Sequence, residues 1–452
     1  MKKLLTVFDT IWAKSGKYLV ALLILTIPLY PKFPLFAIPG TYVAIRLEDF
    51  VIFLVSFVWF VTHIHNLLSI KDKPIWRAFL LFWAVGLLST AAGIVLLQTV
   101  SPLVGLLNWA RRIEYMLPFL LVLDLQITKK ELKFFLMCFA IVVFYIFVYG
   151  FGQKYLNWPI VTTQSGEYSK GIALSYMVGG HLVSTFAGHY DMASFLLLIT
   201  PVLVAFAVRP EILFSTRRKK IALSLFFTVS SLLGLWLLAN AASRISIVSY
   251  FGAISLSLLL IKRARYIPLV ALCIVIIAGT SFSLINRYES IYDVFIKKVH
   301  AADIATPLAR PTPIPTLPPR IEDRSTNIRL AVEWPRAIRA LTKNPLLGTG
   351  YSSITLATDN EFLRSLGEVG ILGTLAFGLC FTLIIGEIVK SFFREKSYTT
   401  KKVLAAAVIG LLAGSFLNMV FIDILEASKF AIMFWLLLGM TVSHIRTTET
   451  YQ

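Results

Sequence analysis

The sequence has 452 residues, of which 57% are hydrophobic and 15% are charged, and its mean hydropathy is +0.78. A chain this apolar is typical of a protein whose main solvent is lipid, so the composition excludes an ordinary soluble globular protein. The net charge of +19 does not indicate nucleic-acid binding, because the cations are spread over alternate loops rather than gathered on one arm or face.

Apolar runs long enough to cross a membrane recur along the chain and predict an all-α polytopic membrane protein with about 12 transmembrane helices. The run at 113–126 falls well short of the roughly 20 residues that a perpendicular helix needs. The predicted spans lie at 18–37, 48–68, 77–98, 113–126, 132–151, 191–209, 219–239, 246–262, 267–285, 368–390, 401–422 and 427–446.

Lysine and arginine are divided unevenly between the loops, and this division sets the predicted orientation. The cation-rich group comprises the loops and ends at 2–17, 71–77, 129–133, 209–220, 262–265 and 390–402, with Arg446. The short loops on the other side hold Lys32, Arg46, Arg111, Arg112, Arg244 and Lys429. The cation-rich side is predicted to be cytoplasmic, with both termini there, and the first apolar run lacks a cleavage site and is predicted to stay in place as a span.

The loops divide the chain into five parts. Residues 1–151 hold spans 1–5, and 152–190 form a first outer loop. Residues 191–285 hold spans 6–9, 286–367 form a large outer loop, and 368–452 hold spans 10–12 and a cytoplasmic tail. The large loop is the predicted functional domain, because it is far too long to be a simple connector.

Three segments follow one another in the large loop. The stretch 286–304 has the pattern of an amphipathic helix lying on the membrane surface. The proline-rich segment at 306–319 predicts an extended linker. The next segment, "TNIRLAVEWPRAIRALTK", predicts a helix that is kinked or split at Pro335.

Arginines on the predicted outer side are candidate ligands for a multiply charged anion. Arg244 stands in a very short turn between two spans, where a cation is disfavoured, and a lipid headgroup contact is the simpler explanation for it alone. Two further groups of arginines favour a phosphate ligand. One is the pair Arg111 and Arg112, and the other comprises Arg324, Arg329, Arg336 and Arg339. Arginine suits phosphate because its planar fork donates paired hydrogen bonds at any working pH.

The segment "NPLLGTGYSSITLATDNEFLRSLGEVGILG" is a second candidate. Gly348 and Gly350 predict a tight turn, and Asp359 and Asn360 precede a helix start, with Asp359 as a possible N-cap. The next span is predicted to begin near Gly370. No metal-binding spacing, dinucleotide fingerprint or Walker motif occurs, and the three cysteines stand alone in separate spans, so neither a metal nor a cofactor is expected.

Six segments occur along the chain in a characteristic order: "RLEDF", "STFAGHYDMASFLLLITP", "SRI", "NIRLAVEWPRAI", "NPLLGTGYSS" and "DNEFLRSLGEVGILG". In these segments and their order the sequence resembles the O-antigen polymerase and ligase superfamily of bacterial envelope glycosyltransferases. The resemblance is best from about Asp191 to Val389. It implies metal-independent transfer of a glycan from a polyprenyl-pyrophosphate carrier to a glycan, lipid or protein acceptor, on the outer face of the bacterial cytoplasmic membrane. Apart from membrane lipids, no other partner is implied.

The resemblance also implies roles for single residues. The family's functional arginines match Arg244 and Arg329, which would neutralise the departing pyrophosphate. Where the family's ligases have histidine, this sequence has Asp359, so a polymerase is favoured over a ligase. Asp359 would orient or deprotonate the acceptor hydroxyl, with Asn360 beside it.

Other readings remain open. His189 and His181 are alternative bases on the outer side, although a structural role is as compatible with their positions. A transporter or flippase of lipid-linked saccharide is the main competing function, but most ionisable residues lie near span ends rather than along a path through the membrane. A scaffold whose arginines bind anionic lipid is a further alternative.

Overall fold

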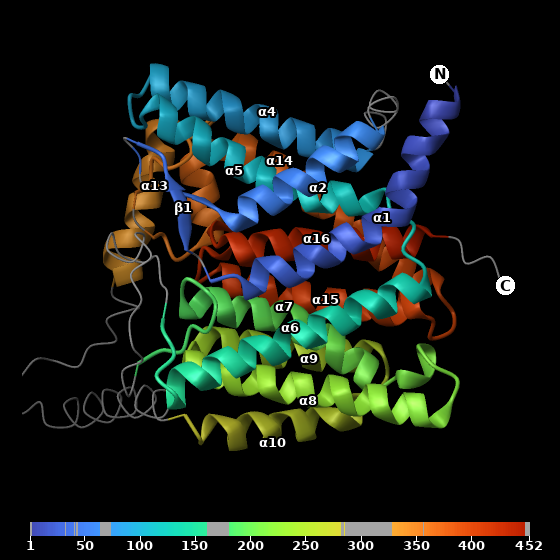
Figure 1. Ribbon diagram of the computed structural model, residues 1–452. Helices are drawn as coiled ribbons and strands as arrows, with labels where there is room; N and C mark the ends of the chain where they lie inside the picture. The colour runs from blue at the N-terminus through green and yellow to red at the C-terminus, as the bar shows by residue number, and fades with distance from the viewer. Residues whose placement is uncertain are drawn as a thin grey trace, which may run out of the picture.

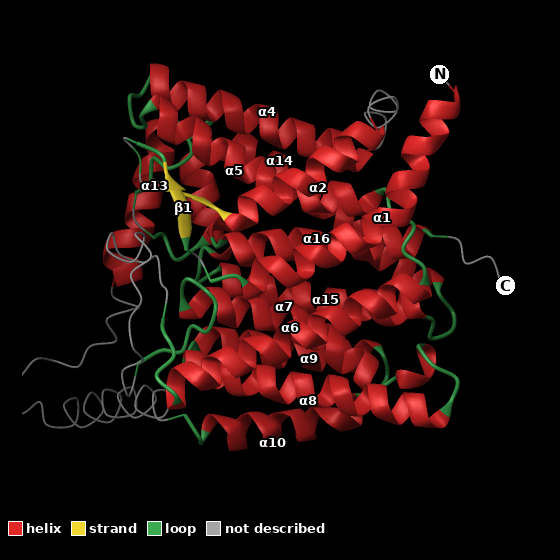
Figure 2. Cartoon of the chain, in the orientation of Figure 1, coloured by secondary structure: helices red, strands yellow, loops and turns green. Residues whose placement is uncertain are grey.

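The computed structural model describes the chain except residues 1, 32, 40, 42, 43, 64–73, 161–179, 282, 283, 285–327, 356 and 448–452. The described part is a bundle of thirteen α-helices, most of them long and running side by side (Figures 1 and 2). The helices are α1 (Lys2–Leu29), α2 (Leu47–His63), α4 (Pro74–Val95), α5 (Pro102–Leu123), α6 (Lys129–Tyr155), α7 (His189–Ala207), α8 (Arg217–Ala241), α9 (Arg244–Leu260), α10 (Ile267–Ala278), α13 (Trp334–Lys343), α14 (Glu361–Arg394), α15 (Thr400–Met419) and α16 (Ser428–Arg446).

A few short elements complete the description. A small antiparallel hairpin pairs β1 (Pro34–Ala37) with β2 (Ala44–Arg46), so the chain is not purely helical. The shorter helical turns are η3 (Pro210–Ile212), η4 (Ala264–Tyr266), the π-helix η5 (Arg329–Glu333) and η6 (Ile424–Glu426).

Seven of the described helices are both long and apolar enough to cross a membrane, and the chain is therefore a polytopic membrane protein. These seven are α4, α6, α7, α8, α14, α15 and α16. Each of the other predicted spans overlaps a helix, namely α1, α2, α5, α9 or α10. The end of the span predicted at 18–37 was wrong, because α1 ends at Leu29 and Pro34–Ala37 form strand β1. The total of twelve crossings stays a prediction.

Two predicted boundaries were wrong for the same reason. The sequence placed span 4 at 113–126, whereas α5 begins at Pro102. It also placed the start of span 10 at residue 368, whereas α14 begins at Glu361. In both cases charged residues interrupt the apolar run, and in both cases those charges have partners within the protein that allow the helix to continue.

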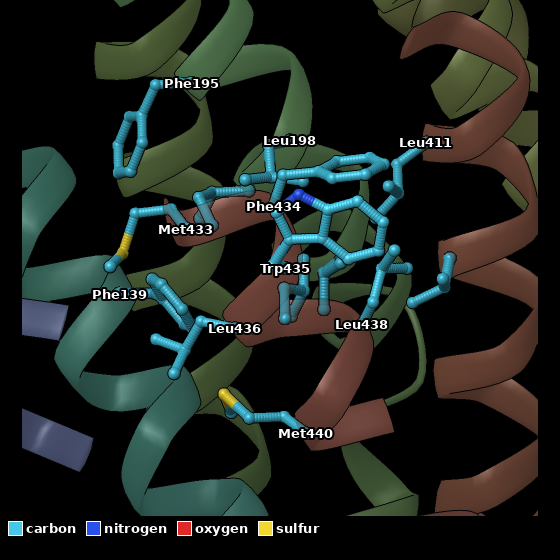
Figure 3. Close-up of a cluster of buried hydrophobic side chains, with 14 of the residues drawn as sticks. Phe139, Phe195, Leu198, Leu411, Met433, Phe434, Trp435, Leu436, Leu438 and Met440 are labelled. Carbon is cyan, nitrogen blue, oxygen red and sulfur yellow. The ribbon is translucent and has the colours of Figure 1, made fainter. Parts of the chain in front are cut away.

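The core surrounds α16, which lies in the middle of the bundle (Figures 1 and 3). Phe434 and Trp435 of α16 pack among side chains that come from the neighbouring helices, such as Phe139 and Leu198. Trp435 is 2% exposed, although Trp is a large side chain that is rarely covered so completely. The burial holds the C-terminal helix as the axis of the molecule.

The cation-rich loops meet at one end of the bundle, the end that also carries both chain termini (Figure 1). There Arg209 Nη2 donates to Ile261 O at 2.7 Å, and Lys401 Nζ donates to Thr447 O at 2.6 Å. The other end carries α13 and the hairpin (Figure 1). It is called the α13 end below.

Helix α14 is broken at Gly370, where the backbone has φ 66° and ψ −170°. Backbone groups freed by the break are satisfied by the loop before α14, as an interrupted helix in an apolar environment requires. The four bonds run from Thr349 N to Gly367 O (3.0 Å), Gly350 N to Glu368 O (2.8 Å), Ile371 N to Pro345 O (2.9 Å) and Leu372 N to Leu346 O (3.1 Å). The segment that contains Gly348 and Gly350 therefore packs against the break in α14. The span does not begin at Gly370 but passes through it.

Candidate active site

An ion pair between Arg329 and Asp359 is the centre of the candidate site. Arg329 Nε and Nη2 both donate to Asp359 Oδ2, at 2.9 and 2.7 Å. The two side chains are mostly covered, with 12% and 21% of their surface exposed. The pair joins residues thirty positions apart and lies at the α13 end of the bundle.

Local backbone features bring the two residues together. Arg329 opens the π-helix η5, in which Trp334 N donates to Arg329 O, and α13 follows directly. Pro335 has no N–H to donate, and the wide π turn before it absorbs this loss without splitting the helix. The predicted split at Pro335 is therefore wrong, although the irregularity is there.

Asp359 stands at a left-handed position with φ 48°, two residues before the start of α14 at Glu361. The N-cap of α14 is Asn360, whose Oδ1 accepts from Leu363 N at 2.9 Å. The prediction of Asp359 as an N-cap was wrong. Because Asn360 supplies the cap, the Asp359 carboxylate is left to pair with Arg329.

Aromatic and imidazole side chains from α7 flank the pair. On α7, Tyr190 lies close enough to the Arg329 guanidinium to interact with its charge. The Tyr190 ring lies 4.0 Å from that of His189, which in turn stacks on His181 at 4.3 Å. The structure thus brings Arg329 and Asp359 together and places His189 beside Tyr190.

The acids of this group hold their protons more tightly than free carboxylic acids do. Burial raises the pKa of Asp359, and its pairing with Arg329 offsets this only in part. Burial, reinforced by the charge of Asp359, raises the pKa of Glu333 to about 7. The site therefore contains a guanidinium and two carboxyl groups, one of them poised near neutrality.

A second ionic cluster supports the loop that carries Asp359. Arg364 contacts three carboxylates, those of Asp423 (2.8 Å), Glu426 (3.0 Å) and Glu368 (3.3 Å). Asp423 also accepts from the backbone N–H of Thr358 at 3.3 Å. The cluster thereby fixes the residue that precedes Asp359 to the segment between α15 and α16.

Arg111 and Arg112 are used in contacts within the protein. Arg112 pairs with Glu426 and lies over the ring of Tyr351 at 5.4 Å. Arg111 Nη2 donates to Ala44 O at 3.0 Å, which ties α5 to the hairpin. These contacts explain why α5 continues through the two arginines.

A cavity of ≈40 Å³ lies within this second cluster, between Arg112, Glu361 and Arg364. One buried water needs about 10–15 Å³ by the same measure, so the cavity holds a few waters but no sugar.

The other predicted residues are placed as follows. Arg244 begins α9 after Ser243, whose Oγ lies 2.7 Å from Ser246 Oγ, and Ser246 donates to Asn418 Oδ1 at 3.2 Å. These hydrogen bonds connect the turn at Arg244 to Asn418, which lies near the end of α15 and five residues before Asp423. Arg336 follows Glu333 and interacts with its charge, Arg339 is exposed, and Arg324 lies outside the described residues.

Sequence reasoning missed Tyr190, Glu333, Arg364, Asp423 and Glu426. Tyr190 is adjacent to His189, and Glu333 lies between Arg329 and Arg336 in the sequence. Arg364 belongs to the segment "DNEFLRSLGEVGILG" that begins at Asp359. Charged residues inside apolar spans were the available signal, since they require partners. In the described ranges, no three His, Cys, Asp or Glu side chains are grouped so as to hold a metal ion.

Fold and site together define a multi-pass helical membrane protein with a charged site at one end of its bundle. Residues 229–378 match the family model of the O-antigen ligase, and this segment includes Arg244, Arg329 and Asp359. The chain is thus a membrane protein that carries an O-antigen ligase domain, which confirms the resemblance seen in the sequence. Members of this family are membrane glycosyltransferase-like enzymes that act on lipid-linked glycans. No curated protein matches the chain.

Proposed function

We propose that this protein transfers glycan from a polyprenyl-pyrophosphate-linked donor by an inverting, metal-independent displacement. A polymerase, in which another lipid-linked glycan is the acceptor, is favoured over a ligase. The α13 end faces away from the cytoplasm of a bacterium, in the cytoplasmic membrane, and both termini lie inside. The Arg329–Asp359 pair within the matched segment carries the proposal.

The charges suit the chemistry of a pyrophosphate leaving group. As the anomeric C–O bond breaks, negative charge develops on the bridging oxygen, and a preorganised guanidinium stabilises it. The two hydrogen bonds to Asp359 hold Arg329 in place before any substrate binds. Arg244 is the second cation in the proposal, on the turn that is tied to α15.

An acceptor hydroxyl has to lose its proton as it attacks, and a carboxylate at hydrogen-bonding distance is suited to take it. Asp359 and Glu333 are the two carboxyl groups beside Arg329. Arg336 and Asn360 are further candidates for binding sugar or phosphate oxygens, and Arg111 and Arg112 would act through the fold of the site.

Reconstitution tests the proposal. The purified protein in lipid nanodiscs is incubated with a polyprenyl-pyrophosphate-linked repeat unit, first alone and then with a candidate acceptor, and products are resolved on a gel. A ladder from donor alone supports a polymerase, and a single shift that needs the acceptor supports a ligase. Movement of donor across proteoliposomes without any product would instead support the transporter.

The variant Arg329→Gln keeps the length and polarity of the side chain but removes its charge. We expect its turnover to fall by about 10²–10³, the usual effect of losing one donor to a developing oxyanion. Arg217→Gln, at the exposed start of α8 at the opposite end of the bundle, is the matched control and should retain activity. Equal activity in both variants would contradict the role of Arg329.

A further inference from the structure

The two carboxyl groups beside Arg329 are not equivalent. Asp359 Oδ2 accepts two hydrogen bonds from the Arg329 guanidinium, and such charge-assisted bonds stabilise the ionised form. Because both bonds converge on one oxygen, this carboxylate is already engaged by the guanidinium and acts as its orienting partner. Its geometry fixes the direction in which Arg329 points.

Glu333 lies four residues after Arg329, on the next turn of the same helical segment. Neither of its carboxylate oxygens accepts a hydrogen bond from another described residue, and Oε2 is turned inward. Two other polar atoms of this turn, Trp334 Nε1 and Arg336 Nη1, are also buried without a hydrogen-bond partner among the described residues. Buried polar groups require hydrogen-bond partners, so these three atoms are available to a bound sugar or phosphate.

The charges around Glu333 are mixed. Asp359 and Asp423 disfavour its ionised form, whereas Arg329 and Arg336 favour it. On the side of α7, Tyr190 interacts with the Arg329 guanidinium, its ring contacts that of His189, and His189 in turn stacks on His181. A binding phosphate would add negative charge here and would make Glu333 a stronger base at the moment of reaction.

We infer that Glu333 takes the proton from the acceptor hydroxyl, and that Asp359 positions Arg329. In this step the acceptor oxygen forms a bond to the anomeric carbon while the bond from that carbon to the pyrophosphate oxygen breaks. The bonding pair leaves with the lipid pyrophosphate, which Arg329 faces, and the hydroxyl proton moves to Glu333. Water takes this proton after the product has left. The inference rests on the proposed function and names the base of that same site.

The test compares the pH dependence of turnover in three proteins, using the nanodisc assay with lipid-linked repeat unit. Wild-type activity should rise through an acidic limb near pH 7, where Glu333 loses its proton. Glu333→Gln should lose about 10²–10⁴ in turnover, the contribution of a general base, and should lack the limb. Asp359→Asn should be less active but should retain the limb, shifted to lower pH, because Glu333 then loses a negative neighbour.

Two further variants make the result specific. Glu333→Ala should regain part of its turnover when formate is added, since a small carboxylate fits the space that the side chain leaves, and a merely structural role would not be rescued in this way. Glu211→Gln, at the opposite end of the bundle and 41% exposed, is the control for removing a carboxylate and should match wild type. All variants are first compared with wild type in elution volume and thermal unfolding.

A Glu333→Gln protein with wild-type turnover would overturn the inference, as would an acidic limb that Asp359→Asn abolishes. If Glu333→Gln does not fold, the profile of Asp359→Asn still decides between the two carboxylates. A wild-type protein that forms no glycan product would refute the proposed function, which is a different outcome from either of these.

Discussion

Replacing Gly370 by alanine tests whether the break in α14 and its contact with the preceding loop require glycine. The backbone there has φ 66° and ψ −170°, a conformation that side chains with a Cβ avoid at a cost of about 1–3 kcal/mol. A Cβ would also lie 2.5 Å from Gly348 N, and closer still to the carbonyl oxygen of Leu346. These are backbone atoms that cannot turn aside, so overpacking adds about 1–3 kcal/mol. The two terms together predict a loss of about 2–6 kcal/mol.

Thermal unfolding in detergent, followed by tryptophan fluorescence, measures this loss. Gly378→Ala is the matched control, because it lies in the same helix and its Cβ would meet no atom within 4 Å. Alanine is favoured over glycine by about 1 kcal/mol in a helix interior, so the control should be as stable as wild type or more so. If Gly370→Ala were as stable as Gly378→Ala, the requirement for glycine at this break would be refuted.

Three other perturbations give distinct results. Lys429→Met should destabilise the protein by about 2–6 kcal/mol, at about 1–3 kcal/mol for each of the two carbonyl oxygens, of Tyr30 and Thr185, that lose their lysine donor, and thermal inactivation measures this. The Pro28 carbonyl oxygen keeps the hydrogen bond from Thr185 Oγ1. Asp423→Asn should lower turnover by about tenfold or more, because the residue before Asp359 loses its anchor, while leaving the elution volume unchanged. The pKa of Glu333 is raised from 4.5 to about 7 in the folded protein. Its contribution to stability is therefore fully present below pH 4.5 and is lost as the pH rises through 7. A titration of thermal stability should show this fall, and Glu333→Gln should flatten it.

The second ionic cluster gives the site its rigidity. Arg364 holds three carboxylates, and breaking such a covered group is costly because the remaining charges are left unpaired. The cluster joins α5, α14 and the segment between α15 and α16, which are far apart in the sequence. Asp359 is therefore positioned by the whole bundle and not by its own loop alone.

The sequence alone determined the membrane class of this protein and the positions of its apolar helices. Hydrophobic length is a local property, and lipid imposes it on each span separately, so runs such as 191–209 coincide with α7 almost residue for residue. The helix around Trp334 could also be predicted from its pattern. The roles of Arg329 and Asp359, which come from the resemblance, stay predictions.

Only the tertiary structure decided how the charges are paired. From the sequence, Arg329 was expected to bind the pyrophosphate and Asp359 to contact the acceptor hydroxyl. Their ion pair could not be predicted, because the two residues are thirty positions apart. The roles of Tyr190 and Glu333 depend on α7 meeting a π turn, which no local pattern signals. Partners across a bundle depend on how helices pack, and packing is set by the sum of many side-chain contacts rather than by any one segment.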